Sequence, residues 1–276
     1  MSVNDLLETI SENNQPSNPT KDSSLDRRKF FKRAGTAGLG IAAGTMLTGS
    51  LQKLSASTTY SDADIVNFAL NLEYLEAEFY SVATYGATLE HRGLLPSSAI
   101  SGPTTGGKMV NFKGSNIAYI ASALRVDEEK HVAYLRKALG SGAVKKPTIN
   151  LNALGFGFNN MGEFLKLARI FEDVGVSAYL GAAPLIQNKT YLDAAARILA
   201  TEAQHAGAVR IEVITWGVAN VKVDSKDVPP TQSNPFDVDS NALSIPRSPS
   251  EVLNIVYHGG SHSGGFYPNG MNGTIK

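Results

Sequence analysis

Two Glu-x-x-His motifs are the residues in this sequence best suited to chemistry. The first runs from Glu128 to His131 and the second from Glu202 to His205. Residues three apart lie on the same face of an α-helix, so each motif can present a carboxylate and an imidazole to one metal ion. Iron and manganese both accept such ligands. We therefore predict that these four residues are metal ligands.

The protein contains no cysteine. Disulfides, thiolate metal sites and iron–sulfur clusters are therefore excluded, and any metal must be bound by nitrogen and oxygen atoms. An oxidase built on such a site would need a reductant from outside the chain.

The two motifs lie in a region whose apolar residues recur at helical spacing. Ser61 and Asp64 resemble a helix start, Asn160 and Glu163 resemble a capping box, and Gly140 suits a helix end. Pro184 is expected to kink or end the third helix. The predicted helices span about 61–86, 117–140, 160–187 and 190–217.

Four glutamates fall at one level of these predicted helices. Each lies 12 or 13 residues after the presumed helix start, or about 18 Å along the axis. Four carboxylates inside a bundle would carry a large desolvation penalty unless cations neutralised them, and two divalent ions would do so. The alternative is a set of exposed acids that align by chance. The four are Glu73, Glu128, Glu172 and Glu202.

The sequence resembles the ferritin-like di-iron or di-manganese carboxylate proteins in its ligand pattern. In that pattern two helices contribute one Glu each, and the other two contribute one Glu-x-x-His motif each. The stretches 71–80, 127–135 and 171–173 resemble the first three ferritin helices. Over about residues 61–219 the chain looks most similar to the exported ferritin-like domain family that includes plant desiccation-related proteins.

This resemblance implies an all-α fold, a ferritin-like four-helix bundle with a long crossover between the second and third helices. It also implies a dinuclear iron or manganese centre. The implied ligands are Glu73, Glu128, His131, Glu172, Glu202 and His205.

Three tyrosines are candidate catalytic residues because their spacing from the proposed ligands turns them roughly toward the metals. They would hold ligands in place or relay electrons; the alternative is a core tyrosine whose hydroxyl finds any partner. These residues are Tyr80, Tyr134 and Tyr179.

Other polar residues keep two interpretations. Glu76 shares a face with Glu73 and is either a substitute ligand or a surface acid. Arg125 and Arg169 pair with acids near the ligands or are solvated. His91, in a polar loop, is expected to be exposed.

Residues 1–56 are predicted to be an export signal. Arg27 and Arg28 precede Phe30 and the weakly apolar run 34–51, which resembles a twin-arginine signal. Cleavage is expected near Ala56. The alternative is a basic amphipathic arm. The signal implies the twin-arginine export machinery as a partner and a periplasmic or secreted location.

Charge argues against nucleic acid as a partner. Removal of residues 1–56 takes away seven basic and five acidic residues, leaving 18 basic and 20 acidic ones and a net charge of −2. A near-neutral chain without a basic stripe has no electrostatic reason to bind DNA or RNA.

Residues 57–219 are expected to form the bundle, and residues 220–276 a Pro- and Gly-rich extension. Its prolines exclude long helices, although a short helix is predicted from Ser248 to Val256. The following segment, with His258 and His262, is expected to be a flexible or packed arm; a lid or a weak metal site are alternatives.

Two classes of function fit these features. One is a metalloenzyme that handles peroxide or dioxygen, as a peroxidase, catalase or oxidase, in oxidative or desiccation stress. The other is a non-catalytic protein for iron storage or structural protection during desiccation. A homo-oligomer is compatible with either class.

Overall fold

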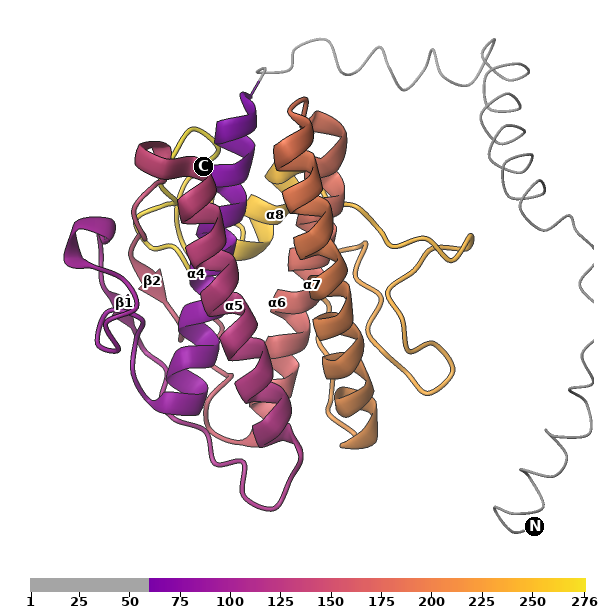
Figure 1. Ribbon diagram of the computed structural model, residues 1–276. Helices are drawn as coiled ribbons and strands as arrows, with labels where there is room; N and C mark the ends of the chain where they lie inside the picture. Colours follow the sequence, from indigo (N-terminus) through magenta and orange to yellow (C-terminus); the bar gives the residue numbers. More distant parts are fainter. Residues whose placement is uncertain (1–59) are drawn as a thin grey trace, which may run out of the picture. The chain divides into compact units, whose positions relative to one another are not determined.

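Four long helices form the core of the molecule in the computed structural model, which describes residues 60–276 (Figure 1). The predicted all-α ferritin-like bundle is therefore confirmed. The export signal predicted for residues 1–56 lies outside the described residues. The long helices are α4 (Asp62–Tyr85), α5 (Ile117–Leu139), α6 (Met161–Ala182) and α7 (Lys189–Thr215), and α8 (Pro249–Val256) is the short helix expected in the extension.

Local chemistry sets the helix ends. Ser61 and Asp64 form a capping box at the start of α4, and Gly86 ends it in a left-handed conformation. Asn160 caps α6, but the Glu163 carboxylate accepts from the amides of Gly157 and Asn159 and does not complete a capping box. α6 stops at Ala182, earlier than expected, because a 3₁₀ turn that contains Pro184 follows it (Ala183–Leu185).

The helices pack mainly as two pairs, α4 with α5 and α6 with α7. The crossover between α5 and α6 contains a strand that the sequence did not predict, β2 (Ile149–Asn150), which pairs in parallel with β1 (Thr104–Thr105). The buried Lys146 ammonium donates to the Gly102 carbonyl and the Thr104 hydroxyl, both at 2.9 Å. The crossover is thereby attached to the loop between α4 and α5. The remaining 3₁₀ turns are Ser97–Ala99 and Gly140–Gly142.

The C-terminal extension packs on the bundle through buried charges. The Arg169 guanidinium donates to both carboxylate oxygens of Asp227 at 2.7 and 2.9 Å. Arg210 donates to Asp173 at 2.7 Å and to carbonyls of the extension. Near its end, the Tyr267 hydroxyl donates to the Asn71 carbonyl of α4. The extension is therefore a packed arm.

Within residues 60–276, no helix combines the length and the apolar character that crossing a lipid bilayer requires.

Candidate metal centre

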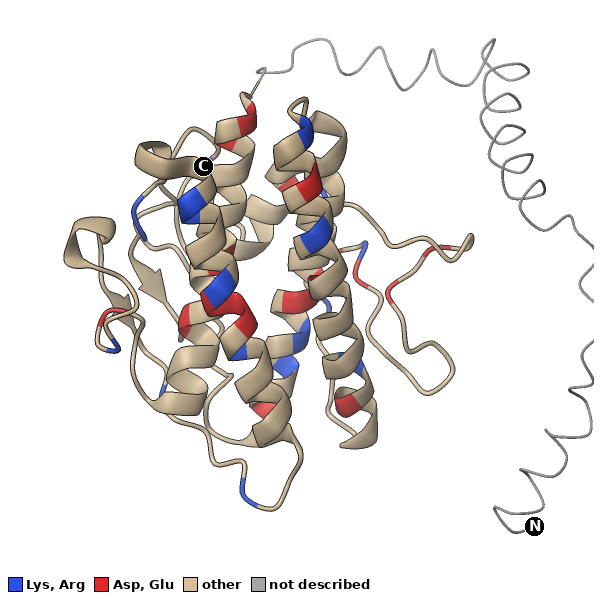
Figure 2. Cartoon of the chain, in the orientation of Figure 1, with Lys and Arg blue, Asp and Glu red and all other residues tan. Residues whose placement is uncertain are grey.

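Four carboxylates lie completely buried at mid-height of the long helices. Glu73 comes from α4, Glu128 from α5, Glu172 from α6 and Glu202 from α7, and each has 0% of its surface exposed. Figure 2 shows acidic positions near the middle of the helices. The chance alignment of exposed acids is therefore wrong for these residues. The structure brings the four together because each lies three to four turns into its helix.

His131 is the centre of a first group of possible ligands. Its Nδ1 lies 3.2 Å from a carboxylate oxygen of Glu73 and 3.1 Å from oxygens of both Glu128 and Glu202. One ligand atom from each of these four residues falls within 4.8 Å of all the others. A single metal ion can therefore be bound by three carboxylates and one imidazole.

His205 belongs to a second group, which overlaps the first. Its Nδ1 lies 2.8 Å from Glu128 and 3.5 Å from Glu172. Glu128, Glu172, Glu202 and His205 again offer ligand atoms within 4.8 Å of one another. Glu128 and Glu202 occur in both groups, so these two carboxylates are placed to bridge two metals.

The donor atoms fit such metals because the protein does not satisfy them by itself. Buried carboxylate oxygens normally accept hydrogen bonds, and a buried charge is costly unless it is paired. Within residues 60–276, buried polar atoms without a hydrogen bond include oxygens of Glu73, Glu128 and Glu172, both oxygens of Glu202, and Nδ1 of His205. Two divalent cations would neutralise the four carboxylates and use these atoms. The residues present therefore fit a dinuclear iron or manganese centre.

The cluster also shifts the pKa values of its members. Burial disfavours charge on His131 and His205, but the adjacent carboxylates outweigh it, raising the pKa of His131 far above its usual value and that of His205 to about 12. Burial raises the pKa of Glu128 to about 7, and burial with the nearby Glu128 carboxylate raises that of Glu202 well above 4.5. Burial also acts on Glu73, yet the His131 imidazolium lowers its pKa overall. The protein groups alone therefore bind several protons that metals would displace.

Two of the three predicted tyrosines contact the cluster. The Tyr80 hydroxyl donates to Oε1 of Glu172, and the Tyr179 hydroxyl donates to Oε1 of Glu73 at 2.6 Å. Burial and these carboxylates raise both tyrosine pKa values well above 10, so both phenols stay protonated donors. Each orients the carboxylate that belongs to only one ligand group.

Tyr134 differs from the other two tyrosines, because within residues 60–276 it makes no hydrogen bond to the cluster. Its side chain is 46% exposed. The buried face of α5 includes Leu124, Glu128 and Leu135, with His131 at its edge. Tyr134 follows His131 by three residues, and it lies beyond that edge, where its side chain is exposed to solvent.

Glu76 is not a surface acid, because only 4% of it is exposed. Oε1 of Glu76 and Oε2 of Glu202 both lie close to Gly175 of α6. A Cβ atom added at this glycine would lie 3.0 Å from the first oxygen and 3.3 Å from the second. Burial raises the pKa of Glu76 well above 4.5, and the nearby Glu202 carboxylate adds to the effect. These effects favour the neutral form of Glu76 beside the cluster.

Sequence reasoning missed Asp127, whose carboxylate lies 3.4 Å from Nε2 of His205. A carboxylate on the second nitrogen of a metal-binding histidine fixes the orientation of the ring. The available signal was its position directly before Glu128. Solvation of Arg125 and Arg169 is excluded, since Arg125 pairs with Glu129 at 2.8 Å and Arg169 is completely buried. His91 is exposed, as predicted.

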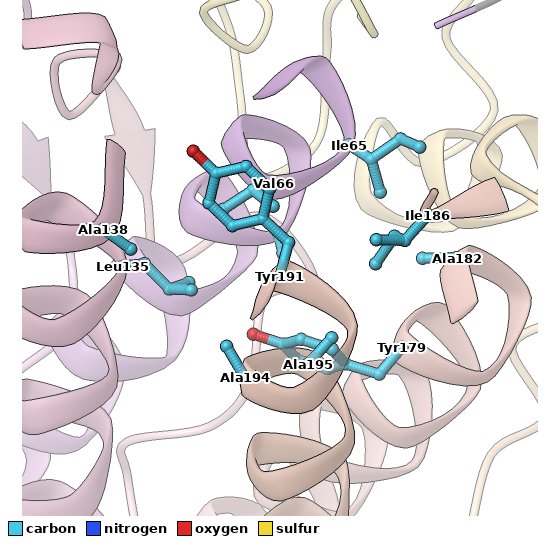
Figure 3. Close-up of a pocket in the computed structure, with 11 residues that line it drawn as sticks. Ile65, Val66, Leu135, Ala138, Tyr179, Ala182, Ile186, Tyr191, Ala194 and Ala195 are labelled. Atoms are coloured by element: carbon cyan, nitrogen blue, oxygen red, sulfur yellow. The ribbon is translucent and has the colours of Figure 1, made fainter. Parts of the chain in front are cut away.

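A small apolar cavity lies beside the centre, where α4 and α7 begin and α5 and α6 end (Figure 3). Its volume is about 20 Å³, room for roughly one water-sized molecule. Tyr179, the donor to Glu73, forms part of its wall, together with Leu135 and several alanines. A molecule larger than a few atoms would not fit between the cavity walls.

Comparison with known proteins gives three similarities. The sequence model of the ferritin-like domain family matches residues 61–214. The ferritin-like catalase Nec2 of Nesocodon mauritianus is 24% identical over an alignment 267 positions long; the alignment covers 78% of this chain and 85% of that protein. The desiccation-related protein PCC13-62 of Craterostigma plantagineum is 26% identical over an alignment 167 positions long, which covers 54% of this chain and 52% of that protein.

Proposed function

The chain belongs to the ferritin-like domain family, and from this premise we propose that it carries a dinuclear iron or manganese centre that disproportionates hydrogen peroxide. The observation that carries the proposal is the pair of overlapping ligand groups that share Glu128 and Glu202. A set of four carboxylates in total, with one imidazole for each metal, is typical of the ferritin-like di-iron and di-manganese centres.

When bound, the metals would supply the electron exchange with peroxide and polarise its oxygens. The protein would supply the arrangement of the ligands. Glu128 and Glu202 would be shared between the metals, while Tyr80 and Tyr179 hold Glu172 and Glu73 in fixed orientations. Asp127 would keep the His205 ring turned toward the cluster.

Peroxide disproportionation also moves protons, since two molecules of hydrogen peroxide give one of dioxygen and two of water. Burial and the nearby Glu202 carboxylate raise the pKa of Glu76, which suits its carboxyl group to hold one of these protons. A small cavity of about 20 Å³ lies next to Tyr179, beside the proposed centre. A relative named a ferritin-like catalase supports this reaction.

A second candidate function is protection during desiccation without catalysis, in which the metals stabilise the fold. The similarity to a desiccation-related protein favours it. The two candidates differ in peroxide turnover by the metal-loaded protein.

We also propose that the protein is exported through the twin-arginine machinery to the periplasm or outside the cell, on the basis of Arg27 and Arg28. Replacement of both by lysine should leave the precursor in the cytoplasm, as seen by fractionation. Undiminished export of that variant would contradict the proposal.

Reconstitution tests the catalytic proposal. The protein is loaded with iron or with manganese, and peroxide loss, oxygen release and mineral formation are followed. We expect oxygen release that is lost in His131→Gln and His205→Gln and kept in His91→Gln, a matched control at an exposed position. Mineral formation would favour storage, and inertness with both metals would favour the protective function.

A further inference from the structure

A second pocket lies between the C-terminal extension and α6, and none of the six candidate metal ligands lines it. Its volume is about 440 Å³, within the usual range of small-molecule sites, about 300–1,000 Å³. Segments distant in the sequence form it: the crossover, α6, the loop after α7, and α8 with the residues that follow it.

The inner walls are apolar and partly aromatic, built from Leu154, Phe156, Ile170, Ile255 and Phe266. Phe266 is 1% exposed and packs edge-on against Phe171 at a centroid distance of 5.0 Å. Its ring is therefore held rigidly. Phe156 is half-buried and has the Lys166 ammonium 5.3 Å from its ring centroid. Of the two phenyl rings, the half-buried Phe156 is therefore the one with surface left for an apolar group to pack against.

The rim carries the positive charge. Lys222, Asn254 and His258 line it, and no acidic residue is among the lining residues of the described chain. The Lys222 ammonium makes no ion pair with any residue of the 60–276 region, and its side chain is exposed at the opening. A ligand with an apolar body and a negative end would be complementary to this arrangement.

His258 holds its place at the rim through an unusual backbone conformation. It follows α8 with a φ of 53°, a left-handed position that glycine normally fills at a helix end. Its amide donates to Ile255 at 3.0 Å, and the next amide, of Gly259, donates to Asn254 at 2.8 Å. These bonds fix the point from which the imidazole projects.

We propose that this pocket binds a small aromatic carboxylate. The ring of the ligand packs against the partly exposed apolar lining, which includes Phe156 and Ile255, and its carboxylate lies at the rim near Lys222 and His258. The site is separate from the metal centre, because none of the six candidate metal ligands lines the pocket. Binding is therefore independent of metal loading and of the proposed catalytic activity.

Benzoate is the probe, measured by ligand-observed saturation-transfer NMR and by calorimetric titration of the full chain, both metal-free and metal-loaded. We expect benzoate to bind both forms equally and more tightly than benzyl alcohol, with benzylamine the weakest. Lys222→Gln should weaken benzoate binding by about threefold, the size of an exposed charge interaction. His258→Gly removes the imidazole from the rim and should weaken benzoate binding as well.

His258→Gly is informative because glycine suits the left-handed position, so its thermal unfolding should stay at or above that of the wild type. Lys137→Gln, at an exposed lysine on α5, is the control and should bind benzoate unchanged. Absence of benzoate binding would overturn the proposal. Wild-type affinity in both rim variants, or equal binding of benzylamine, would overturn it as well.

Discussion

Metal uptake should release protons, and the cluster sets how many. His131 and His205 have strongly raised pKa values, so both imidazoles are protonated at neutral pH without metal. An imidazole must lose its ring proton before it can bind a metal. The two histidines alone account for two protons per chain. Glu128, with a pKa of about 7, adds about half a proton at pH 7, and Glu202, whose pKa is raised well above 4.5, can add up to one more.

The expected release is therefore between about two and four protons per chain. By linkage, the product of the two metal dissociation constants should fall at least about 100-fold for each unit of rising pH near neutrality. The assay is a titration of manganese(II), or of iron(II) without oxygen, into weakly buffered metal-free protein containing a pH indicator. His205→Gln should release about one proton fewer, and His91→Gln should match the wild type. Release of less than one proton per chain would refute the reasoning, as would identical release by His205→Gln.

The same shifts determine how stability of the metal-free protein depends on pH. The pKa of Glu128 is raised from 4.5 to about 7 by folding. Its contribution is therefore fully present below about pH 4.5 and is lost as pH rises through 7. The histidine contributions, present below the unfolded pKa of about 6.5, begin to fall over the same range. The melting temperature of metal-free protein should thus fall between pH 5 and pH 8, and metal loading should remove this fall. A rise in the metal-free melting temperature over that range would contradict the assigned shifts.

Three further predictions concern single side chains. Glu76→Gln should keep both metals while Glu202→Gln loses at least one, because a glutamine mimics the neutral acid expected at position 76 but not an ionised ligand. Metal analysis of the two variants tests this prediction, and equal metal loss in both would contradict it. Tyr179→Phe leaves Oε1 of Glu73 without its donor and should lower the free energy of unfolding by about 1–3 kcal/mol. Tyr134→Phe, at an exposed position, should change the free energy of unfolding little. Chemical denaturation measures both variants, and an unchanged stability of Tyr179→Phe would contradict the hydrogen bond. Asp227→Asn leaves the completely buried Arg169 guanidinium poorly paired and should lower the free energy of unfolding by about 3–5 kcal/mol. Asp193→Asn, in an exposed ion pair, should lower it by about 0.5 kcal/mol or less. Similar losses in the two variants would contradict the buried Arg169–Asp227 ion pair.

Local signals in the sequence predicted the bundle because they act within a few residues. The Ser61–Asp64 capping box and Gly86 bound α4, and the count from each helix start placed four glutamates at one level. A straight helix rises by a fixed distance per residue, so that count carries into three dimensions without tertiary information. The same reasoning gave the two Glu-x-x-His faces.

Other features depend on contacts between distant segments. Arg169 pairs with Asp227, 58 positions along the chain, and no local pattern distinguishes it from a solvated arginine. Glu76 is buried because the C-terminal extension covers that side of α4 with Phe266 and Val256. The exposure of Tyr134 could not be predicted, because helical spacing gives the angle between two residues but not where the buried face of a helix ends.

Metal content is the most direct test of the central claim. The full chain, produced with ample iron and manganese, is analysed by inductively coupled plasma mass spectrometry beside Glu128→Ala and His205→Ala. The arrangement of shared Glu128 and Glu202 carboxylates predicts about two metal ions per chain. Each variant should lose at least one of them, while His91→Ala keeps both. A wild-type protein that retains no metal, or variants that retain both ions, would contradict the dinuclear centre.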